Sequence, residues 1–280
     1  MSDAGPPQVA KALLGGSAVH EETSVAANST PWSYPRWIAH RGAGTLAPEN
    51  TLAAFRLGAS HGYRMFECDA RLSADGVPFL MHDATLTRTT NAREVFGPAT
   101  SDVGGDHPWS ELAKLDAGRW HSPGYAGEPL PTLESISRYC LANGYLLNIE
   151  IKPTPGVEHR TGAVVGRHAD RLWNNAPTAP LLTSFRPEAL EGARSTAAHL
   201  PRGLLLDALG EGWLEQAIAL DCVAVVCNHP LLDMATVAKV HGAGLKCLSY
   251  TVNDEWTAQR LLQLRTDGII TDRVDLFPPV

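Results

Sequence analysis

The chain has 280 residues, of which 44% are hydrophobic and 19% are charged, and its formal net charge is −7. This composition is ordinary for a globular protein, and the length suits one large domain. An acidic chain offers no basic footprint for nucleic acid, so we expect no nucleic-acid partner. No apolar run approaches the roughly 18 residues of a membrane-spanning helix, so we expect no stable membrane insertion.

The N-terminal stretch, residues 1–34, mixes Gly, Ala, Ser and Pro with charged residues. Its apolar cluster at residues 12–14 is too short for the apolar region of a secretory signal. The number of cysteines, five, is odd and they form no C-x-x-C pair, which indicates buried free thiols in a reducing compartment. We therefore expect a cytoplasmic protein with a flexible N-terminal arm and a single domain over residues 35–280.

Short apolar runs alternate with amphipathic stretches from residue 37 to the end of the chain. Near-continuous apolar runs are typical of strands that are buried on both faces of a parallel sheet. Eight strands are predicted, at residues 37–41, 63–71, 146–152, 180–185, 203–207, 222–228, 245–253 and 268–271. Seven helices are predicted, at residues 50–61, 132–143, 158–173, 187–196, 211–220, 231–241 and 254–265.

This alternation predicts a closed (β/α)8 TIM barrel. An open doubly wound sheet is the alternative, but the G-x-G-x-x-G fingerprint that would support it is missing from the sequence. The interval after the second strand is too long for one crossover. Asp75 and Gly76 predict a hairpin turn, so residues 77–82 should return as a short strand. Residues 83–131 or so then form a small insertion over the barrel mouth, with a short helix at 109–115.

Two acidic residues lie on the second predicted strand. Glu67 and Asp69 are two residues apart, so both carboxylates point to the same face of the strand. Their neighbours Met65, Phe66 and Cys68 are apolar, and like charges on a buried face repel unless a cation lies between them. Surface exposure is the alternative reading of an isolated E-x-D pair. Carboxylate oxygens suit hard cations, so we expect one divalent metal ion, Mg²⁺ or Ca²⁺.

Further polar residues end neighbouring strands. The segment N-I-E-I-K places Glu150 and Lys152 on one face of the third barrel strand. With Arg41 nearby, three carboxylates and two cations indicate a metal ion and an anion bound together, and a phosphate fits this pattern. A structural network of internal salt bridges is the alternative. His40 and His82 also end strands, and two such histidines suggest an acid and a base.

With these residues assembled, the sequence resembles the glycerophosphodiester phosphodiesterase family of the bacterial cytoplasmic type. The matching segments occur in the family's order and span about residues 36–275. They are A-H-R-G-A-G-T-L-A-P-E-N-T-L-A-A-F (39–55), E-C-D (67–69), M-H-D-A-T-L-T-R-T-T-N (81–91), L-D-A-G-R-W (115–120), L-P-T-L-E (130–134), I-E-I-K (149–152) and Y-T-V-N-D (250–254).

The resemblance implies a TIM barrel with a small insertion after the second strand. It implies a divalent metal held by Glu67, Asp69 and Glu150, and catalysis by His40 and His82. Arg41 and Lys152 are expected to bind the phosphate, and Glu49 and Asn50 of the P-E-N-T loop are expected to support the site. Phe185 and Trp256 are expected to pack on the carbon skeleton of the substrate. For the two aromatic residues, plain packing at the barrel mouth is the alternative.

The implied reaction is metal-dependent hydrolysis of a small-molecule glycerophosphodiester, such as glycerophosphocholine or glycerophosphoethanolamine, to glycerol 3-phosphate and an alcohol. One histidine would deprotonate a glycerol hydroxyl for attack on phosphorus, and the other would protonate the leaving alcohol. We expect His40 as the first base and His82 as the acid, with the reverse order open. The alternatives are a lysophospholipase D and a barrel that binds glycerophosphodiesters without hydrolysing them.

Overall fold

The computed structural model describes residues 1–2 and 32–279, so nearly all of the arm predicted at residues 1–34 lies outside the described residues. Residues 32–279 form a nine-stranded sheet with the strand order β1-β9-β8-β7-β6-β5-β4-β2-β3. Strand β1 (Trp37–Ala39) pairs in parallel with both β9 (Gly268–Thr271) and β2 (Met65–Leu72). These two pairings close the sheet into a barrel and rule out the open doubly wound alternative.

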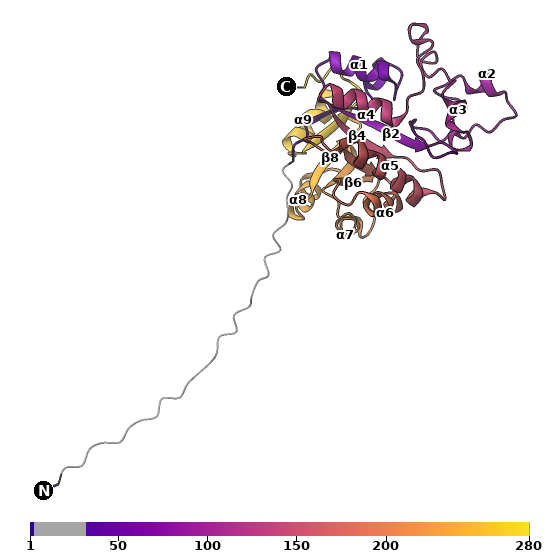
Figure 1. The fold of residues 1–280 in the computed structure, drawn as a ribbon. Helices are drawn as coiled ribbons and strands as arrows, with labels where there is room; N and C mark the ends of the chain where they lie inside the picture. Colours follow the sequence, from indigo (N-terminus) through magenta and orange to yellow (C-terminus); the bar gives the residue numbers. More distant parts are fainter. Residues whose placement is uncertain (3–31, 280) are drawn as a thin grey trace. The chain divides into compact units, whose positions relative to one another are not determined.

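The elements between β2 and β9 follow the predicted alternation (Figure 1). The parallel strands are β4 (Leu146–Ile151), β5 (Leu181–Ser184), β6 (Arg202–Leu206), β7 (Ala224–Asn228) and β8 (Lys246–Tyr250). The seven predicted helices are α1 (Leu52–Ser60), α4 (Leu133–Ala142), α5 (Glu158–Trp173), α6 (Pro187–Thr196), α7 (Trp213–Ala219), α8 (Met234–Gly242) and α9 (Glu255–Gln263). The (β/α)8 TIM barrel is therefore confirmed.

The interval after β2 begins with a hairpin. Strand β3 (Pro78–Leu80) runs antiparallel to β2, after a turn in which Gly76 has a φ of +83°. Helices α2 (Ala92–Phe96) and α3 (Trp109–Leu112) follow, and Figure 1 shows them on one side of the barrel. Two 3-10 turns, Gly104–Asp106 and Pro123–Tyr125, complete this segment. The sequence predicted α3 but not α2, since five residues are too few to show a helical period.

The alternation of side chains along β2 positions the polar residues of the barrel. Phe66 and Cys68 pack outward in the same apolar cluster as residues of α1, α4 and α5. Met65 belongs instead to the apolar layer inside the barrel, together with residues from β1, β5, β6, β7, β8 and β9. Glu67 and Asp69 lie two and four residues after Met65 and therefore also face the interior, at the carboxyl end of the strand. The barrel thus has an apolar floor and an acidic mouth.

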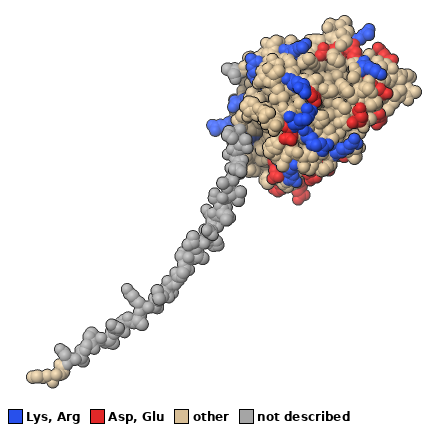
Figure 2. Space-filling view, in the orientation of Figure 1, with Lys and Arg blue, Asp and Glu red and all other residues tan. Residues whose placement is uncertain are grey.

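The cysteines and the surface agree with the composition. Within residues 32–279 all five cysteines are free and buried, which confirms the predicted buried free thiols. Basic and acidic side chains are interspersed on the face drawn in Figure 2. None of the helices in the described part of the chain has the length and apolar character needed to cross a bilayer.

Gly44 allows the loop after β1 to lie against the loop after β9. Its φ is +58°, and a Cβ at this position would lie 2.1 Å from the carbonyl oxygen of Asp272. The backbone N–H of Thr45 donates a hydrogen bond to the same carbonyl, at 3.4 Å. Only glycine tolerates both the left-handed backbone and this close approach. Gly44 therefore helps to set the position of Asp272 relative to the first loop.

Replacing Gly44 should show how much this close approach contributes. We expect Gly44→Ala to lower the free energy of unfolding by more than the roughly 1–2 kcal/mol of left-handed strain, because the new Cβ overlaps backbone atoms. Gly97→Ala is the matched control, since Gly97 also has a positive φ (+83°) but no atom within 4 Å of the built Cβ. Urea denaturation measures both variants, and equal losses would contradict the steric argument.

Candidate active site

Three buried carboxylates lie at the mouth of the barrel. Glu67 and Asp69 belong to β2 and Glu150 to β4, and Asp69 is paired with Glu150 in the parallel register. One oxygen atom from each carboxylate lies within 4.8 Å of the others. Among the described residues, Glu67 Oε1 and Asp69 Oδ1 are buried without a hydrogen-bond partner. Buried, unsatisfied carboxylate oxygens fit a divalent cation with oxygen ligands.

The three carboxyl groups differ in acidity. Burial raises the pKa of Glu67 well above its ordinary value, and the negative charges of Asp69 and Glu150 raise it further. Burial and Asp69 also raise the pKa of Glu150, against the opposing effect of Lys152. Burial alone would raise the pKa of Asp69, but Arg41 and Lys152 hold it well below its usual range. A cation among the three would favour the charged form of each.

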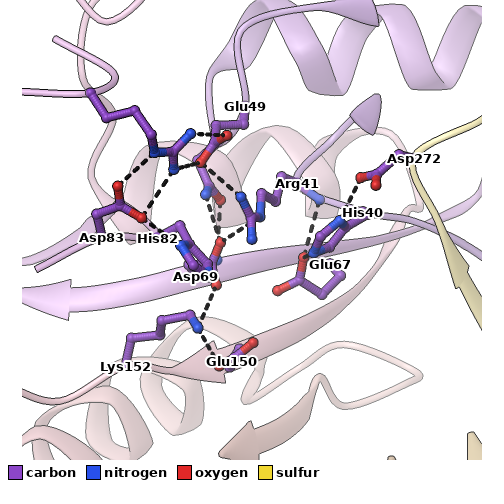
Figure 3. Close-up of polar contacts among 12 residues, drawn as sticks. His40, Arg41, Glu49, Glu67, Asp69, His82, Asp83, Glu150, Lys152 and Asp272 are labelled. Atoms are coloured by element: carbon purple, nitrogen blue, oxygen red, sulfur yellow. Dashed lines mark hydrogen bonds and ion pairs between the residues drawn. The ribbon is translucent and has the colours of Figure 1, made fainter. Parts of the chain in front are cut away.

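Two cationic side chains border this acidic cluster (Figure 3). Lys152 Nζ lies 2.8 Å from Glu150 Oε1 and 3.6 Å from Asp69 Oδ1. Arg41 Nε lies 3.2 Å from Asp69 Oδ2, and Arg41 Nη1 donates to Glu49 Oε1 at 2.9 Å. Both cations also line the cavity at the barrel mouth. The residues that the sequence predicted for a metal ion and an anion therefore lie together, and their binding of either stays a prediction.

Both candidate catalytic histidines have an acidic partner. His40 Nδ1 lies 2.6 Å from Asp272 Oδ1, and His82 Nδ1 lies 2.7 Å from Asp83 Oδ1. A carboxylate at Nδ1 favours the tautomer with its proton on Nδ1, which leaves Nε2 to exchange a proton with a substrate. Both rings line the cavity, and burial lowers the pKa of His82. The two pairs are thus alike in construction.

The P-E-N-T loop supports the site as expected. Asn50 is buried, and its Nδ2 donates to Asp69 Oδ2 at 2.8 Å while its Oδ1 accepts from the Asp69 N–H at 3.1 Å. Glu49 accepts hydrogen bonds from Arg41 and from Arg88. These contacts hold Asp69 and Arg41 in place, so the loop orients groups that face the cavity.

Phe185 lies at the cavity, whereas Trp256 lies apart from it. Phe185 follows β5, and its ring centroid is 5.7 Å from Lys152 Nζ and 5.7 Å from the ring centroid of Tyr250. Trp256 lies in the first turn of α9, is 73% exposed, and is not among the residues that line this cavity. A contact between Trp256 and the substrate therefore stays a prediction.

Four residues of this site were missed in the sequence: Asp83, Asp272, Arg88 and Arg71. Asp83 and Asp272 directly follow strand-end residues, and that position was a signal that could have found them. Arg71 is the last residue but one of β2, and its Nε and Nη2 donate to the carbonyl oxygen of His82 at 3.1 and 2.6 Å. Its Nη1 donates to the carbonyl oxygen of Lys152 at 3.2 Å. Arg71 therefore ties the loops after β3 and β4 together.

The cavity at the barrel mouth, which His40, Arg41, His82 and Lys152 help to line, has a volume of about 150 Å³. One wall is charged and comes from β1, β2, β4 and the loop after β3. An apolar wall is formed by Phe185, Leu205, Tyr250 and Ile270, and Asn148, Thr183 and Thr251 add polar groups to the lining. A small anion with a short carbon skeleton matches both walls.

Similarity to known proteins identifies the family of this chain. Residues 40–276 match the glycerophosphoryl diester phosphodiesterase family. The chain belongs to this family. A glycerophosphodiester phosphodiesterase of Caldanaerobacter subterraneus subsp. tengcongensis is 31% identical over 243 residues, which cover 84% of this chain and 93% of that protein. The resemblance noted in the sequence is therefore confirmed, and the protein is an enzyme of the phosphodiesterase type.

Solved structures agree with the family assignment. A phosphodiesterase from Oleispira antarctica, in complex with the product sn-glycerol-3-phosphate, is 33% identical with a TM-score of 0.77. The match covers 85% of this chain and 93% of that chain. A glycerophosphodiester phosphodiesterase from Agrobacterium tumefaciens is 28% identical with a TM-score of 0.70, over 88% of this chain and all of that one (100%).

The acidic cluster makes a prediction about stability. Mg²⁺ or Ca²⁺ at 100 times its Kd should stabilise the protein by about 2.7 kcal/mol, or roughly 5–10 °C in melting temperature. Glu67→Gln should abolish this shift, because it removes one ligand. In chelator the variant should melt at or above the wild-type temperature, because the amide removes repulsion from Asp69 and Glu150. Scanning calorimetry measures both effects.

The control for this measurement is Glu188→Gln, which makes the same charge change at an exposed position on α6. It should keep the full metal-dependent shift. A metal-dependent shift of wild-type size in Glu67→Gln would show that the cation binds elsewhere.

Proposed function

We propose that this phosphodiesterase hydrolyses glycerophosphodiesters, including glycerophosphocholine and glycerophosphoethanolamine, to glycerol 3-phosphate and an alcohol, and that it requires Mg²⁺ or Ca²⁺. The observation that carries the proposal is one small cavity lined by two carboxylates, two cations and two histidines: Glu67, Glu150, Arg41, Lys152, His40 and His82. Asp69 completes the carboxylate triad beside this cavity, and each histidine is paired with an aspartate. The triad of Glu67, Asp69 and Glu150 would hold the metal.

Each part of the site has a role in this reaction. A bound divalent cation supplies charge that stabilises negative oxygen atoms and makes a hydroxyl group more acidic. Arg41 and Lys152 hold the phosphate by charge-assisted hydrogen bonds. Phe185 and Tyr250 offer an apolar wall to the carbon skeleton of the glycerol group. Glu49 and Asn50 keep Arg41 and Asp69 in position for these contacts.

The two histidines carry the proton transfers. One takes the proton of a glycerol hydroxyl as its oxygen forms a bond to phosphorus, and the other protonates the alcohol oxygen as its bond to phosphorus breaks. The product of this step is a cyclic phosphate, which water opens with the two roles reversed. Asp272 and Asp83 hold the two rings through Nδ1, and Nε2 of His40 lies 3.7 Å from Glu67 Oε2. Either histidine can act as the base, and the nitrophenyl ester described below distinguishes the two orders.

Metal dependence is tested by chelation. EDTA should abolish release of glycerol 3-phosphate from glycerophosphocholine, and added Mg²⁺ or Ca²⁺ should restore it, because the triad loses its cation. A coupled assay for glycerol 3-phosphate measures this. Full turnover in chelator would contradict the metal requirement. Faster turnover of lysophosphatidylcholine than of glycerophosphocholine would favour the lysophospholipase D alternative.

The histidine pair is tested by substitution. His40→Ala and His82→Ala should each lower kcat by about 10²–10⁴, the usual contribution of a general acid or base. The double variant should lose little more than either single one, since both act on one proton-transfer sequence. A nitrophenyl ester needs little protonation on leaving, so it should rescue only the variant that lacks the acid.

His199→Ala serves as the control, because this histidine has a side chain that is 68% exposed. It should retain wild-type turnover. A loss below tenfold in both His40→Ala and His82→Ala would contradict acid–base catalysis by this pair.

A further inference from the structure

A second cavity, of about 380 Å³, adjoins the first. His40 and Arg41 line both cavities. The remaining walls come from the loop after β1, the insertion and the loop after β9, and the insertion meets the first loop where His121 Nε2 lies 3.0 Å from the carbonyl oxygen of Thr45. The polar and aromatic side chains of these walls are Thr45, Glu49, Arg88, Trp120, His121 and Asp272.

The shared residues define how a diester would span the two cavities. Glu67 and Glu150 of the triad and the apolar wall line the first cavity, which therefore suits the glycerol group that attacks phosphorus. A phosphate held at Arg41 then lies at the boundary between the cavities. The other ester group of the phosphate, which leaves as an alcohol, points toward the second cavity. The volume of this cavity is sufficient for a small headgroup.

The second cavity contains donors, acceptors and an aromatic face. Trp120 is 39% exposed, and its Nε1 donates to the carbonyl oxygen of Ala117 at 2.8 Å, which fixes the ring. The side chain of Arg88 is 43% exposed, and four of its five N–H groups already donate to Glu49 and Asp83, which leaves one on Nη1 for a ligand. Glu49 and Asp272, 12% and 21% exposed, already have partners of their own but keep lone pairs that can accept further hydrogen bonds. A hydroxyl group both donates and accepts, so several hydroxyls on one carbon skeleton match this set.

A quaternary ammonium headgroup matches the same walls poorly. It has no hydrogen-bond donor, so it would displace water from Arg88 and Glu49 without replacing the lost hydrogen bonds. The indole face of Trp120 attracts cations. The positive charges of Arg41 and Arg88 oppose the binding of a cation at Trp120. The negative charges of Glu49 and Asp272 neutralise them but leave no net negative charge to attract a cation. The balance of charges therefore favours a neutral, hydroxyl-rich headgroup.

We propose that this second cavity binds the leaving alcohol and selects a polyhydroxy alcohol, such as glycerol or an inositol, over choline. The inference rests on the proposed phosphodiesterase reaction and deepens it by naming the preferred substrate class.

The test compares two substrates of the wild-type enzyme, glycerophosphoglycerol and glycerophosphocholine. We expect kcat/KM to be at least tenfold higher for glycerophosphoglycerol. Equal values, or a preference for glycerophosphocholine, would overturn the inference while leaving the proposed reaction intact. Failure of the enzyme to release glycerol 3-phosphate from either substrate would instead overturn the proposed reaction itself.

Two substitutions assign the preference to the second cavity. Arg88→Gln and Trp120→Ala should each lower the ratio of the two kcat/KM values at least threefold. Arg88 also holds Asp83 beside His82, so general turnover should fall as well, but the ratio cancels a loss that both substrates share. Trp120→Phe should keep most of the preference, because it retains an aromatic face.

Arg93→Gln is the matched control for Arg88→Gln. Arg93 is exposed on α2, so the variant makes the same charge change within the insertion but outside this cavity. Its ratio should equal that of the wild-type enzyme. An unchanged ratio in both Arg88→Gln and Trp120→Ala would show that headgroup selection does not occur in the second cavity.

Discussion

The repulsion among Glu67, Asp69 and Glu150 is the constraint on which the rest of the site depends. Ionising all three groups is costly, because one oxygen atom from each lies within 4.8 Å of the others. Burial and this repulsion raise the pKa values of Glu67 and Glu150. Arg41 and Lys152 offset part of this cost, mostly at Asp69, whose pKa they lower. A divalent cation would offset the rest, and the three carboxylates could hold one.

A chain of charged side chains connects the site to the insertion. Arg41 is held by Glu49, Glu49 by Arg88, and Arg88 by Asp83, which in turn holds His82. One continuous set of ion pairs thus runs from the loop after β1 into the insertion (Figure 3). Because each carboxylate in this set has at least two partners, loss of one member displaces its neighbours. The insertion thus contributes to the position of His82 through Asp83 and Arg88.

Most of the fold, and the centre of the site, could be predicted from the sequence, because they depend on local patterns. Helices α5 and α6 have the predicted bounds, since their amphipathic patterns run the full length of each helix. Glu67 and Asp69 were found from the two-residue period of one strand. Asp272 was missed because its contact with His40 depends on the β1–β9 pairing, which joins residues more than 200 positions apart. Trp256 was predicted to contact the substrate because the predicted strand ended at residue 253, close to Trp256, whereas β8 ends at Tyr250.

The two cavities divide the work of the enzyme between two kinds of structure. The first is built on barrel strands, whose register fixes the triad and the apolar wall, and rigid strands suit groups that must meet a transition state closely. Loops and the insertion form most of the second, and such segments can change without disturbing the barrel. His40 and Arg41 border both, so one phosphate can be held at the junction while different headgroups are accepted or refused beyond it. Bond cleavage and headgroup selection can therefore vary independently in this architecture.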